Sequence, residues 1–309
     1  MAESTANLTG KSVGVEVSNT TITGICLEAN GEISETRKSV LDSPRTTLEQ
    51  IVEFINEFKV HLGGFDKIGI AVPGLVHQET KRIAFSTFIP EHSEVDLLGE
   101  LETATNLKIT IENDANAAAY GEFRLGAGRE SRNMFYATLG TGVGGALIFD
   151  GKIWRGKSGF AGEFGYMILN SEGLKLEEVA STANIVRRTR NRYRQDGTTS
   201  LGKFEEDQIT LGDIVREAKE GDDFAILMLE RTGIYVGTAI AGVINLLNIE
   251  KIVIGGEIMQ AEGLVLDSII NRARELSFKP SFEAVEIAEG ELGENAAAIG
   301  AALLASETN

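Results

Sequence analysis

The sequence predicts an α/β protein made of two related halves, and three observations support this prediction. Strand patterns rich in β-branched residues alternate with helical patterns along the chain. The length of 309 residues suits two domains with a core each. Two stretches, VGVEVSNTTITGICLEANGEI and YATLGTGVGGALIFDGKIW, repeat one order of strand, small-residue turn with threonine, strand, glycine-bearing turn and strand. We therefore expect each half to open with a hairpin whose turn faces a common cleft.

The first half combines a hairpin with parallel-type strands and helices. Its expected elements are strands at 12–17, 21–29, 67–72 and 108–112, and helices at 46–58 and 113–126. Asn30-Gly31 is typical of a hairpin turn, and Pro73-Gly74 ends a buried strand. The helix at 46–58 has apolar residues at helical spacing, and the helix at 113–126 begins at an Asn/Asp cap.

The second half repeats this plan with a longer helical region. Its expected elements are a hairpin of strands at 133–139 and 145–154, helical structure at 210–247, a strand at 251–256 and a terminal helix at 294–306. Gly233, Gly237 and Gly242 lie inside the helical region and would let a helix pack closely on its neighbour.

The composition excludes several classes of function. A formal net charge of −17 disfavours duplex nucleic acid and anionic membranes as partners, because both would repel the protein. The N-terminus has no signal character, and no apolar run is long enough to span a bilayer. A single cysteine, Cys26, excludes a disulfide framework, and the three histidines lack the HExxH spacing of a zinc site. We expect a soluble protein of the reducing cytoplasm.

One basic run stands out in this acidic chain. RRTRNRYR, residues 187–194, holds five arginines in eight positions. On a helix, Arg187, Arg190 and Arg194 would share a face. The favoured interpretation is a solvated helix face that balances local acidity, and the alternative is a site for a phosphate group or a partner.

Two nucleotide-binding patterns match the glycine-rich hairpin, and we reject both. GTGVGG, residues 140–145, fits G-x-G-x-x-G, but that fingerprint opens a helix, whereas the following ALIFDGKIW has strand character. GKIWRGKS, residues 151–158, fits the P-loop pattern, but bulky strand residues fill its loop and no helix follows. The favoured interpretation of the glycines is a hairpin turn whose bare amides bind phosphate, with Thr141 adding a hydroxyl, and the alternative is a plain tight turn.

A dense polar cluster lies where the strand at 108–112 ends. Glu112, Asn113, Asp114 and Asn116 separate an apolar strand from an alanine-rich helix, which is more than a helix cap requires. A carboxylate there would accept a proton from a substrate hydroxyl, with Asn113 holding the substrate. Phosphoryl transfer needs little more than such a base, a metal ion and donors placed on the γ-phosphate.

These residues resemble the ROK (repressor, ORF, kinase) family of sugar kinases, which has the two-domain actin-like (ribonuclease H-like) ATPase fold. The resemblance runs from about residue 12 to residue 305. The motifs that support it are IGIAVPGLV, ENDANAAAYGE, TLGTGVGGALIFDGKIWRG, AGEFGY, LLNIEKIVIGG and LGENAAAIGAALLA.

The resemblance implies a role for each matching position. Asp114 corresponds to the catalytic base that takes the proton from a sugar hydroxyl as this attacks ATP. The implied sugar contacts are Asn113, Glu163 and Glu177. The implied phosphate loop is Gly140, Thr141, Gly142, Gly144 and Gly145, and the implied nucleotide pocket includes Gly255 and Gly256.

The sequence departs from the family pattern at three places. The first phosphate loop, usually Asp-x-Gly-Gly-Thr, is EVSNT here: Glu16 would serve Mg²⁺, and Ser18, Asn19 and Thr20 would either crowd the γ-phosphate or donate to it. Tyr166 stands where a zinc-binding, sugar-contacting histidine is common, and the accompanying cysteine cluster is absent, so no zinc is expected. Phe88 stands near a usual sugar-binding asparagine. Tyr166 and Phe88 are thus expected as altered sugar contacts.

The resemblance leads to a specific functional hypothesis. We expect an ATP- and Mg²⁺-dependent kinase for a hexose hydroxyl, with glucose, a related hexose or an N-acyl hexosamine as substrate and polyphosphate as the alternative donor. The competing hypothesis is a non-catalytic sugar- or nucleotide-binding protein. A repressor is disfavoured because about ten polar residues precede the first strand. The expected domains are 1–116 with the returning helix 294–309, and 117–293, with the active site in the cleft between them. A homodimer is implied by resemblance only.

Overall fold

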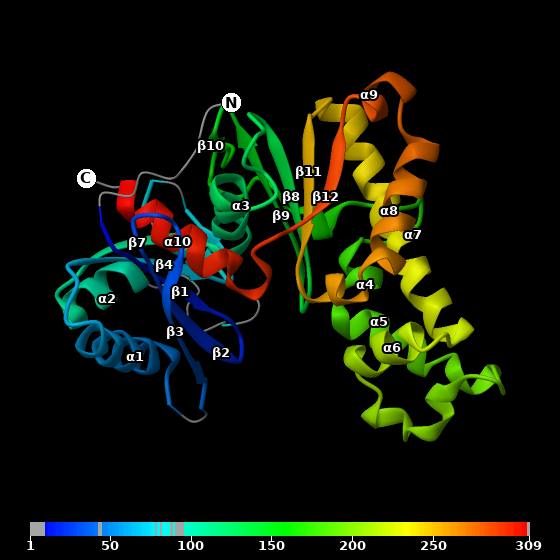
Figure 1. Cartoon of the computed structure of the whole chain (residues 1–309), viewed down its shortest axis with the longest axis horizontal. Coiled ribbons are helices and arrows are strands. Elements are labelled where there is room, and N and C mark those ends of the chain that lie inside the picture. Colours follow the sequence, from blue (N-terminus) through cyan, green and yellow to red (C-terminus); the bar gives the residue numbers. More distant parts are fainter. Residues whose placement is uncertain are drawn as a thin grey trace. The chain divides into compact units, whose positions relative to one another are not determined.

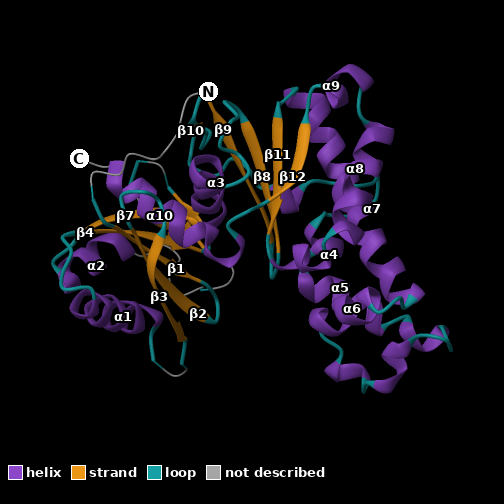
Figure 2. Cartoon of the chain, in the orientation of Figure 1, coloured by secondary structure: helices purple, strands orange, loops and turns teal. Residues whose placement is uncertain are grey.

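The computed structural model describes residues 10–42, 45–77, 79–80, 82–86, 89 and 96–307. The chain divides into two compact units, and each mixes strands with helices (Figures 1 and 2). Unit 1 comprises Met1–Arg132, Ala146–Gly162 and Glu291–Asn309, and unit 2 comprises Asn133–Gly145 and Glu163–Gly290.

Unit 1 is built on a five-stranded sheet of order β3-β2-β1-β4-β7. Its strands are β1 (Ser12–Val17), β2 (Thr21–Leu27), β3 (Ile33–Val40), β4 (Lys67–Val72) and β7 (Lys108–Asn113). β1, β2 and β3 form an antiparallel meander, whereas β4 pairs in parallel with both β1 and β7. The strands expected in the first half are confirmed in type and place.

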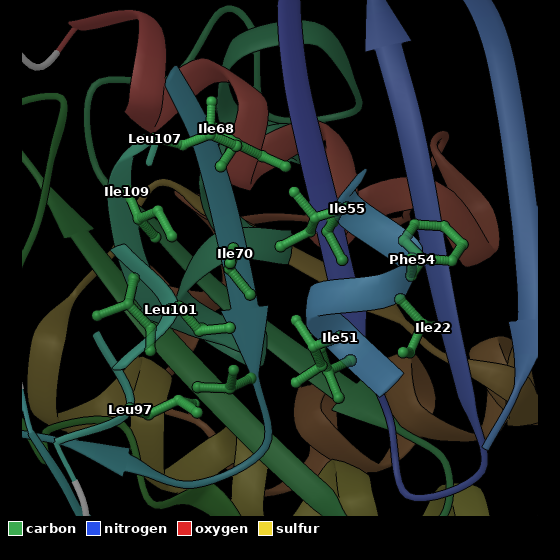
Figure 3. Packing of buried hydrophobic residues seen from close by; sticks show 14 of the residues in the cluster. Ile22, Ile51, Phe54, Ile55, Ile68, Ile70, Leu97, Leu101, Leu107 and Ile109 are labelled. Carbon is green, nitrogen blue, oxygen red and sulfur yellow. The ribbon is translucent and has the colours of Figure 1, made fainter. Parts of the chain in front are cut away.

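Alternation along β1 assigns its side chains to two different layers. Val13, Val15 and Val17 belong to the core that forms between the sheet and helices α1 (Thr47–His61) and α2 (Leu97–Thr105). Figure 3 shows this core, with residues of α1 facing Ile68 and Ile70 of β4. Each fully buried aliphatic side chain of this kind contributes about 2 kcal/mol of hydrophobic stabilisation.

The opposite face of the sheet is covered by the alanine-rich helix α10 (Ala296–Glu307), drawn red in Figure 1. Glycines on the strands allow this close approach, because a Cβ at Gly14 would lie 2.0 Å from the carbonyl oxygen of Ala298. A Cβ at Gly300 would likewise lie 1.7 Å from the carbonyl oxygen of Ala117 in α3 (Asp114–Leu125). Glu16 has the same parity as Gly14 on β1, so its carboxylate extends on the α10 face.

The buried carboxylate of Glu122 fixes the return of the chain into unit 1. It accepts hydrogen bonds from the backbone amides of Ala127 (2.9 Å), Glu291 (3.1 Å) and Leu292 (2.9 Å). Three amide donors compensate the carboxylate for its loss of water. The end of α3 and the segment that precedes α10 are therefore held together.

The second sheet has the order β10-β9-β8-β11-β12. Its strands are β8 (Met134–Leu139), β9 (Val143–Phe149), β10 (Lys152–Ile153), β11 (Lys251–Gly255) and β12 (Glu286–Glu289). β9 and β10 pair antiparallel, and β11 pairs in parallel with β8 and β12. The strand order and chain order match those of the first sheet, which confirms the predicted internal repeat. A strand follows the glycine turn, as the rejection of the dinucleotide fingerprint requires.

The helical region of unit 2 contains two helices where the sequence pattern runs continuously. α6 (Leu211–Lys219) ends before Gly221, which has a φ of +93°, and Asp222 caps α7 (Asp223–Leu247). Two of the predicted glycines pack against α8 (Gly263–Leu276). A Cβ at Gly233 would lie 2.7 Å from the carbonyl oxygen of Val265, and a Cβ at Gly237 would lie 2.6 Å from the carbonyl oxygen of Ile269.

Shorter elements complete the two units. Unit 1 also contains β5 (Leu75–Val76), β6 (Ile83–Phe85) and a 3₁₀ turn at Gly293–Asn295. Unit 2 also contains α4 (Glu177–Ala180), α5 (Thr182–Arg190), α9 (Lys279–Glu283) and 3₁₀ turns at Phe164–Tyr166, Tyr193–Gln195, Ser200–Lys203, Glu206–Gln208 and Glu257–Ala261.

Helix α7 corrects the expectation that no apolar run is long enough to span a bilayer. Its 25 residues pass that test by length and composition, and within the described residues it is the one helix that does so. Of the qualifying window, 61% is buried inside the structure, where α7 packs on α8. Core helices commonly pass the same test, so it is weak evidence for a membrane span.

The observed division of the chain differs from the predicted domain boundaries. Helix α3 belongs to unit 1 rather than to the second domain, because its small residues pack on α10. Residues 146–162 also belong to unit 1, so that the boundary between residues 145 and 146 falls inside β9. The terminal helix lies in unit 1, the unit to which the prediction assigned it.

Candidate active site

The turn from β7 to α3 holds Asn113 and Asp114 in a rigid arrangement. Asn113 is the N-cap of α3, and its Oδ1 accepts from the amide of Asn116 at 3.0 Å. Its Nδ2 donates to the carbonyl oxygen of Gly74 at 3.0 Å and to Oδ1 of Asp114 at 2.9 Å. Oδ1 of Asp114 also accepts from the amide of Ala115 at 2.8 Å. The carboxylate therefore sits in the first helical turn, where the helix dipole favours negative charge.

Beneath this turn lies a buried ion pair between Glu112 and Arg155. Oε2 of Glu112 accepts from Nε (2.9 Å) and Nη2 (2.5 Å) of Arg155 in a forked geometry. Oε1 accepts from the amide of Asn113 and from Nδ2 of Asn116, both at 3.0 Å. The Glu112 side chain is 8% exposed, so these four donors replace its water.

Glu16 brings a second carboxylate into the electrostatic field of Asp114. Burial, together with the negative charge of Asp114, raises the pKa of Glu16 to about 7, while Lys38 acts in the opposite direction. The two negative charges repel each other, and a bound cation would reduce this repulsion.

In the first hairpin turn, residues 18–20, most backbone amides donate to groups of the same hairpin. Oγ of Ser18 accepts from the amides of Thr20 (3.2 Å) and Thr21 (2.9 Å), and the amide of Ser18 donates to the carbonyl oxygen of Thr21 at 2.8 Å. Among the described residues, no hydrogen bond uses the amide of Asn19. Only one amide of this turn is thus left to meet a ligand.

The second hairpin turn, residues 140–142, leaves more of its backbone open. The amide of Gly140 donates to the carbonyl oxygen of Gly142 at 3.0 Å, and the carbonyl oxygen of Gly140 accepts from the amide of Thr182 at 2.8 Å. The amides of Thr141 and Gly142 have no partner among the described residues. Two successive free amides are the elements of an anion nest.

Glycine is required at Gly256 by packing but not at Gly140. A Cβ at Gly140 would meet nothing closer than the amide nitrogen of Glu257 at 3.9 Å, and Gly140 is not among the positive-φ glycines. Gly256 has a φ of +97°, and its Cβ would lie 2.4 Å from the carbonyl oxygen of Leu139. Gly255 is also enclosed, since a Cβ there would lie 2.4 Å from the Tyr136 hydroxyl.

Of the three predicted sugar contacts of unit 2, Glu177 is linked to the strand that follows the second turn. Oε2 of Glu177 accepts from the amide of Val143 at 3.0 Å, which links α4 to the start of β9. Burial and the charge of Glu177 raise the pKa of Glu163, although this side chain keeps considerable contact with solvent. Tyr166 is 57% exposed, and Nζ of Lys175 lies 4.3 Å from the centre of its ring.

The donor set fits a magnesium ion better than a zinc ion. Among the described residues there is no cluster of three or more His, Cys, Asp and Glu side chains that would hold a metal. Mg²⁺ in phosphoryl-transfer sites is usually held by one or two carboxylates together with phosphate oxygens and water. Glu16, the predicted magnesium ligand, supplies one such carboxylate in unit 1.

The remaining predictions have mixed outcomes. Phe88 lies outside the described residues. α5 ends at Arg190, so Arg194 does not share its helix face, and the three arginines bind different groups: Asn184 for Arg187, backbone carbonyls for Arg190 and Glu206 for Arg194. Arg188 differs from them, because burial and neighbouring arginines lower its pKa to about 10.

Comparison with known proteins decides the family. The sequence model of the ROK family matches residues 12–308. The chain belongs to the ROK family. A glucokinase of Halalkalibacterium halodurans is 31% identical over 96% of this chain and 94% of its own. A xylose repressor of Bacillus subtilis is 28% identical over 94% of this chain and 76% of its own. ROK membership therefore includes relatives with two different activities.

Solved ROK structures confirm the fold. A ROK family glucokinase from Streptomyces griseus, in complex with glucose and AMPPNP, matches with a TM-score of 0.85 and 29% identity. The match covers 97% of this chain and 100% of that one. The predicted two-domain actin-like ATPase fold is thus confirmed.

Arg155 is the residue of this site that sequence reasoning missed. The polar cluster around Glu112 was visible as Glu-Asn-Asp-x-Asn at a strand end, but Arg155 reads as one bulky residue of a strand-like run. Its side chain finds Glu112 across 43 positions of sequence. The sequence did not single out Arg155, because Lys152 and Lys157 are also basic residues of the same glycine-rich region.

Proposed function

We propose that the chain is an ATP-dependent sugar kinase that transfers the γ-phosphoryl group to a hexose hydroxyl, with glucose, a related hexose or an N-acyl hexosamine as substrate. The observation that carries the proposal is the rigid strand-to-helix turn that presents the Asp114 carboxylate, in a chain similar to glucokinases. The complex of the S. griseus glucokinase with glucose and AMPPNP supports the choice of both substrates.

In this mechanism Asp114 is the general base. Its carboxylate accepts the proton of the sugar hydroxyl as the hydroxyl oxygen attacks the γ-phosphorus of ATP. Asn113 donates to Oδ1 of Asp114 at 2.9 Å, which fixes the orientation of the carboxylate. Asn113, Glu163, Glu177, Tyr166 and Phe88 are the proposed sugar contacts.

The nucleotide is proposed to bind on the second turn. The free amides of Thr141 and Gly142 would donate to phosphate oxygens, and the absence of side chains at Gly140, Gly144 and Gly145 lets those oxygens approach the backbone. Gly255 and Gly256 would border the nucleotide, and Ser18, Asn19 and Thr20 would approach the γ-phosphate. Mg²⁺, held by Glu16 together with phosphate oxygens and water, would neutralise charge on the phosphates when bound.

The test is ADP release with Mg·ATP over a panel of hexoses and N-acetylhexosamines, with a no-sugar control and Asp114→Asn. We expect turnover that depends on one sugar class and falls at least about 10³-fold in Asp114→Asn, because only a carboxylate accepts the proton. Asp114→Asn with the activity of the wild type would refute the assignment of the base. Formation of the sugar phosphate, measured with ATP or with polyphosphate, identifies the donor, because polyphosphate releases no ADP.

A non-catalytic sugar- or nucleotide-binding protein is the second candidate. It is favoured by one observation, that Ser18 engages the amides of the first turn internally. The same panel separates the two candidates: sugar binding by calorimetry without ADP release supports the second, and sugar-dependent ADP release excludes it.

A cytoplasmic location and a homodimer complete the proposal, with no nucleic acid or membrane partner. The net charge of −17 supports the exclusion of polyanionic partners. Sedimentation velocity would measure the oligomeric state.

A further inference from the structure

We propose that Arg155 is a positioning residue for sugar phosphorylation, acting through Glu112 on Asn113 and Asp114. The inference rests on the proposed kinase function and adds to it a residue that does not touch the sugar or ATP. Three steps of contact connect Arg155 to the base, and a fourth concerns the segment on which Arg155 lies.

The first step is the ion pair itself. The Arg155 guanidinium binds one carboxylate oxygen of Glu112 through two nitrogens, at 2.9 and 2.5 Å. Arg155 is 24% exposed and Glu112 is 8% exposed, so the pair is largely shielded from water. A forked, shielded pair fixes direction as well as distance, which lysine or glutamine at position 155 would not reproduce.

The second step passes from Glu112 to the turn. With Oε2 engaged by Arg155, Oε1 is aimed at the amide of Asn113 and at Nδ2 of Asn116, both at 3.0 Å. One carboxylate thus holds both the backbone at Asn113 and the first turn of α3. Rotation of that carboxylate would release both contacts together.

The third step reaches the proposed base. Asn113, once its backbone is fixed, bridges the carbonyl oxygen of Gly74 and Oδ1 of Asp114, at 3.0 and 2.9 Å. The carboxylate plane of Asp114 is therefore set by a chain of hydrogen bonds that begins at Arg155. A displacement of about 1 Å at a reacting group can reduce turnover by about 10²-fold.

The fourth step concerns the segment on which Arg155 lies. Its carbonyl oxygen accepts from the amides of Gly159 (3.1 Å) and Ala161 (3.3 Å), so Arg155 also organises the turn over residues 155–161. This turn ends two positions before Glu163, a proposed sugar contact. The backbone of Arg155 thus holds the turn that leads to a second proposed sugar contact, while its side chain holds Glu112.

Steady-state kinetics of Arg155→Lys and Arg155→Met, well below their melting temperatures, test the proposal. We expect kcat to fall about tenfold in Arg155→Lys and about 10²-fold in Arg155→Met, with the KM for sugar raised. The KM for ATP should change less than twofold, because the proposed phosphate contacts lie on the second turn. Arg45→Met is the matched control, since it breaks an exposed ion pair with Glu53 in the same unit and should leave all constants unchanged.

A double-mutant cycle with Glu112→Gln separates positioning from folding. If Arg155 acts through Glu112, then adding Arg155→Met to Glu112→Gln should lower kcat by less than threefold further. Unchanged kcat in Arg155→Met, independent effects of the two substitutions, or equal rises in the KM for sugar and ATP would overturn the proposal.

The outcome distinguishes this proposal from the proposed function. A wild-type protein with no sugar-dependent turnover would refute the kinase activity. In that case sugar affinity by calorimetry replaces kcat as the readout, because Asn113 and Glu163 would still be the sugar ligands. Weakened sugar binding in Arg155→Met but not in Arg45→Met would then support the positioning role, and equal binding in both would refute it.

Discussion

The two hairpin turns occupy equivalent places in sheets of the same strand order, yet they are built by opposite means. The first turn is held by side chains, with the Ser18 hydroxyl accepting from two amides of its own turn. The second turn is held by backbone contacts and leaves two successive amides open. The comparison teaches that equal topology does not confer equal binding capacity, because the disposition of the amides decides whether a turn can receive a phosphate.

The strongest contrast is expected between two glycines of unit 2. Gly256→Ala should lower the free energy of unfolding by about 3 kcal/mol, because alanine is strained at positive φ and its Cβ would overlap the carbonyl of Leu139. Gly140→Ala should change it by less than about 0.5 kcal/mol, since the methyl group has room. Urea denaturation of both variants measures the difference. Equal losses would mean that the second turn is as tightly packed as the strand end beside it.

A charge placed on the second turn tests its proposed role with the fold left intact. Gly140→Asp should reduce kcat/KM for ATP by about 10²-fold, because a carboxylate would repel the phosphates, while urea stability stays near that of Gly140→Ala. Gly140→Asn has nearly the same size without the charge and should lose much less. Full activity in Gly140→Asp would exclude this turn as the phosphate site.

The carboxylate of Glu16, beside the first turn, predicts a pH-dependent difference in stability. Its pKa is raised from 4.5 to about 7 in the folded protein, so Glu16 favours folding below pH 4.5 and this contribution is lost as pH rises through 7. Relative to wild type, Glu16→Gln should therefore gain about 3 kcal/mol of stability between pH 4.5 and 8. Thermal denaturation in EDTA at both pH values measures this gain. A difference between the two proteins that does not vary with pH would contradict it.

The smallest effect is expected from opening the first turn. Ser18→Gly removes the hydroxyl that engages the amides of Thr20 and Thr21, at a cost of about 1 kcal/mol in stability. If those amides then reach the nucleotide, kcat/KM for ATP should rise about threefold. Thr20→Ser, which alters the same turn without freeing its amides, is the control. A fall in kcat/KM for ATP in Ser18→Gly would show that the closed turn is the functional form.

Several parts of the fold were predictable from sequence because they depend on local patterns. Strand parity, the Asn cap at Asn113 and the repeat of strand-turn-strand are all read from neighbouring residues. The helical pattern at 210–247 was read correctly in type, but its break at Gly221 was not. The domain boundaries were misplaced because the packing of α3 on α10 joins segments about 180 positions apart.

The candidate site divides in the same way. The expected roles of Asp114, Glu177 and the glycine turn came from the sequence, through its resemblance to a family. The amides that remain open, the pKa of Glu16 and the pairing of Glu112 with Arg155 were decided only by the tertiary structure. Hydrogen-bond satisfaction and desolvation depend on which groups meet in space, and a linear pattern contains that information only for near neighbours.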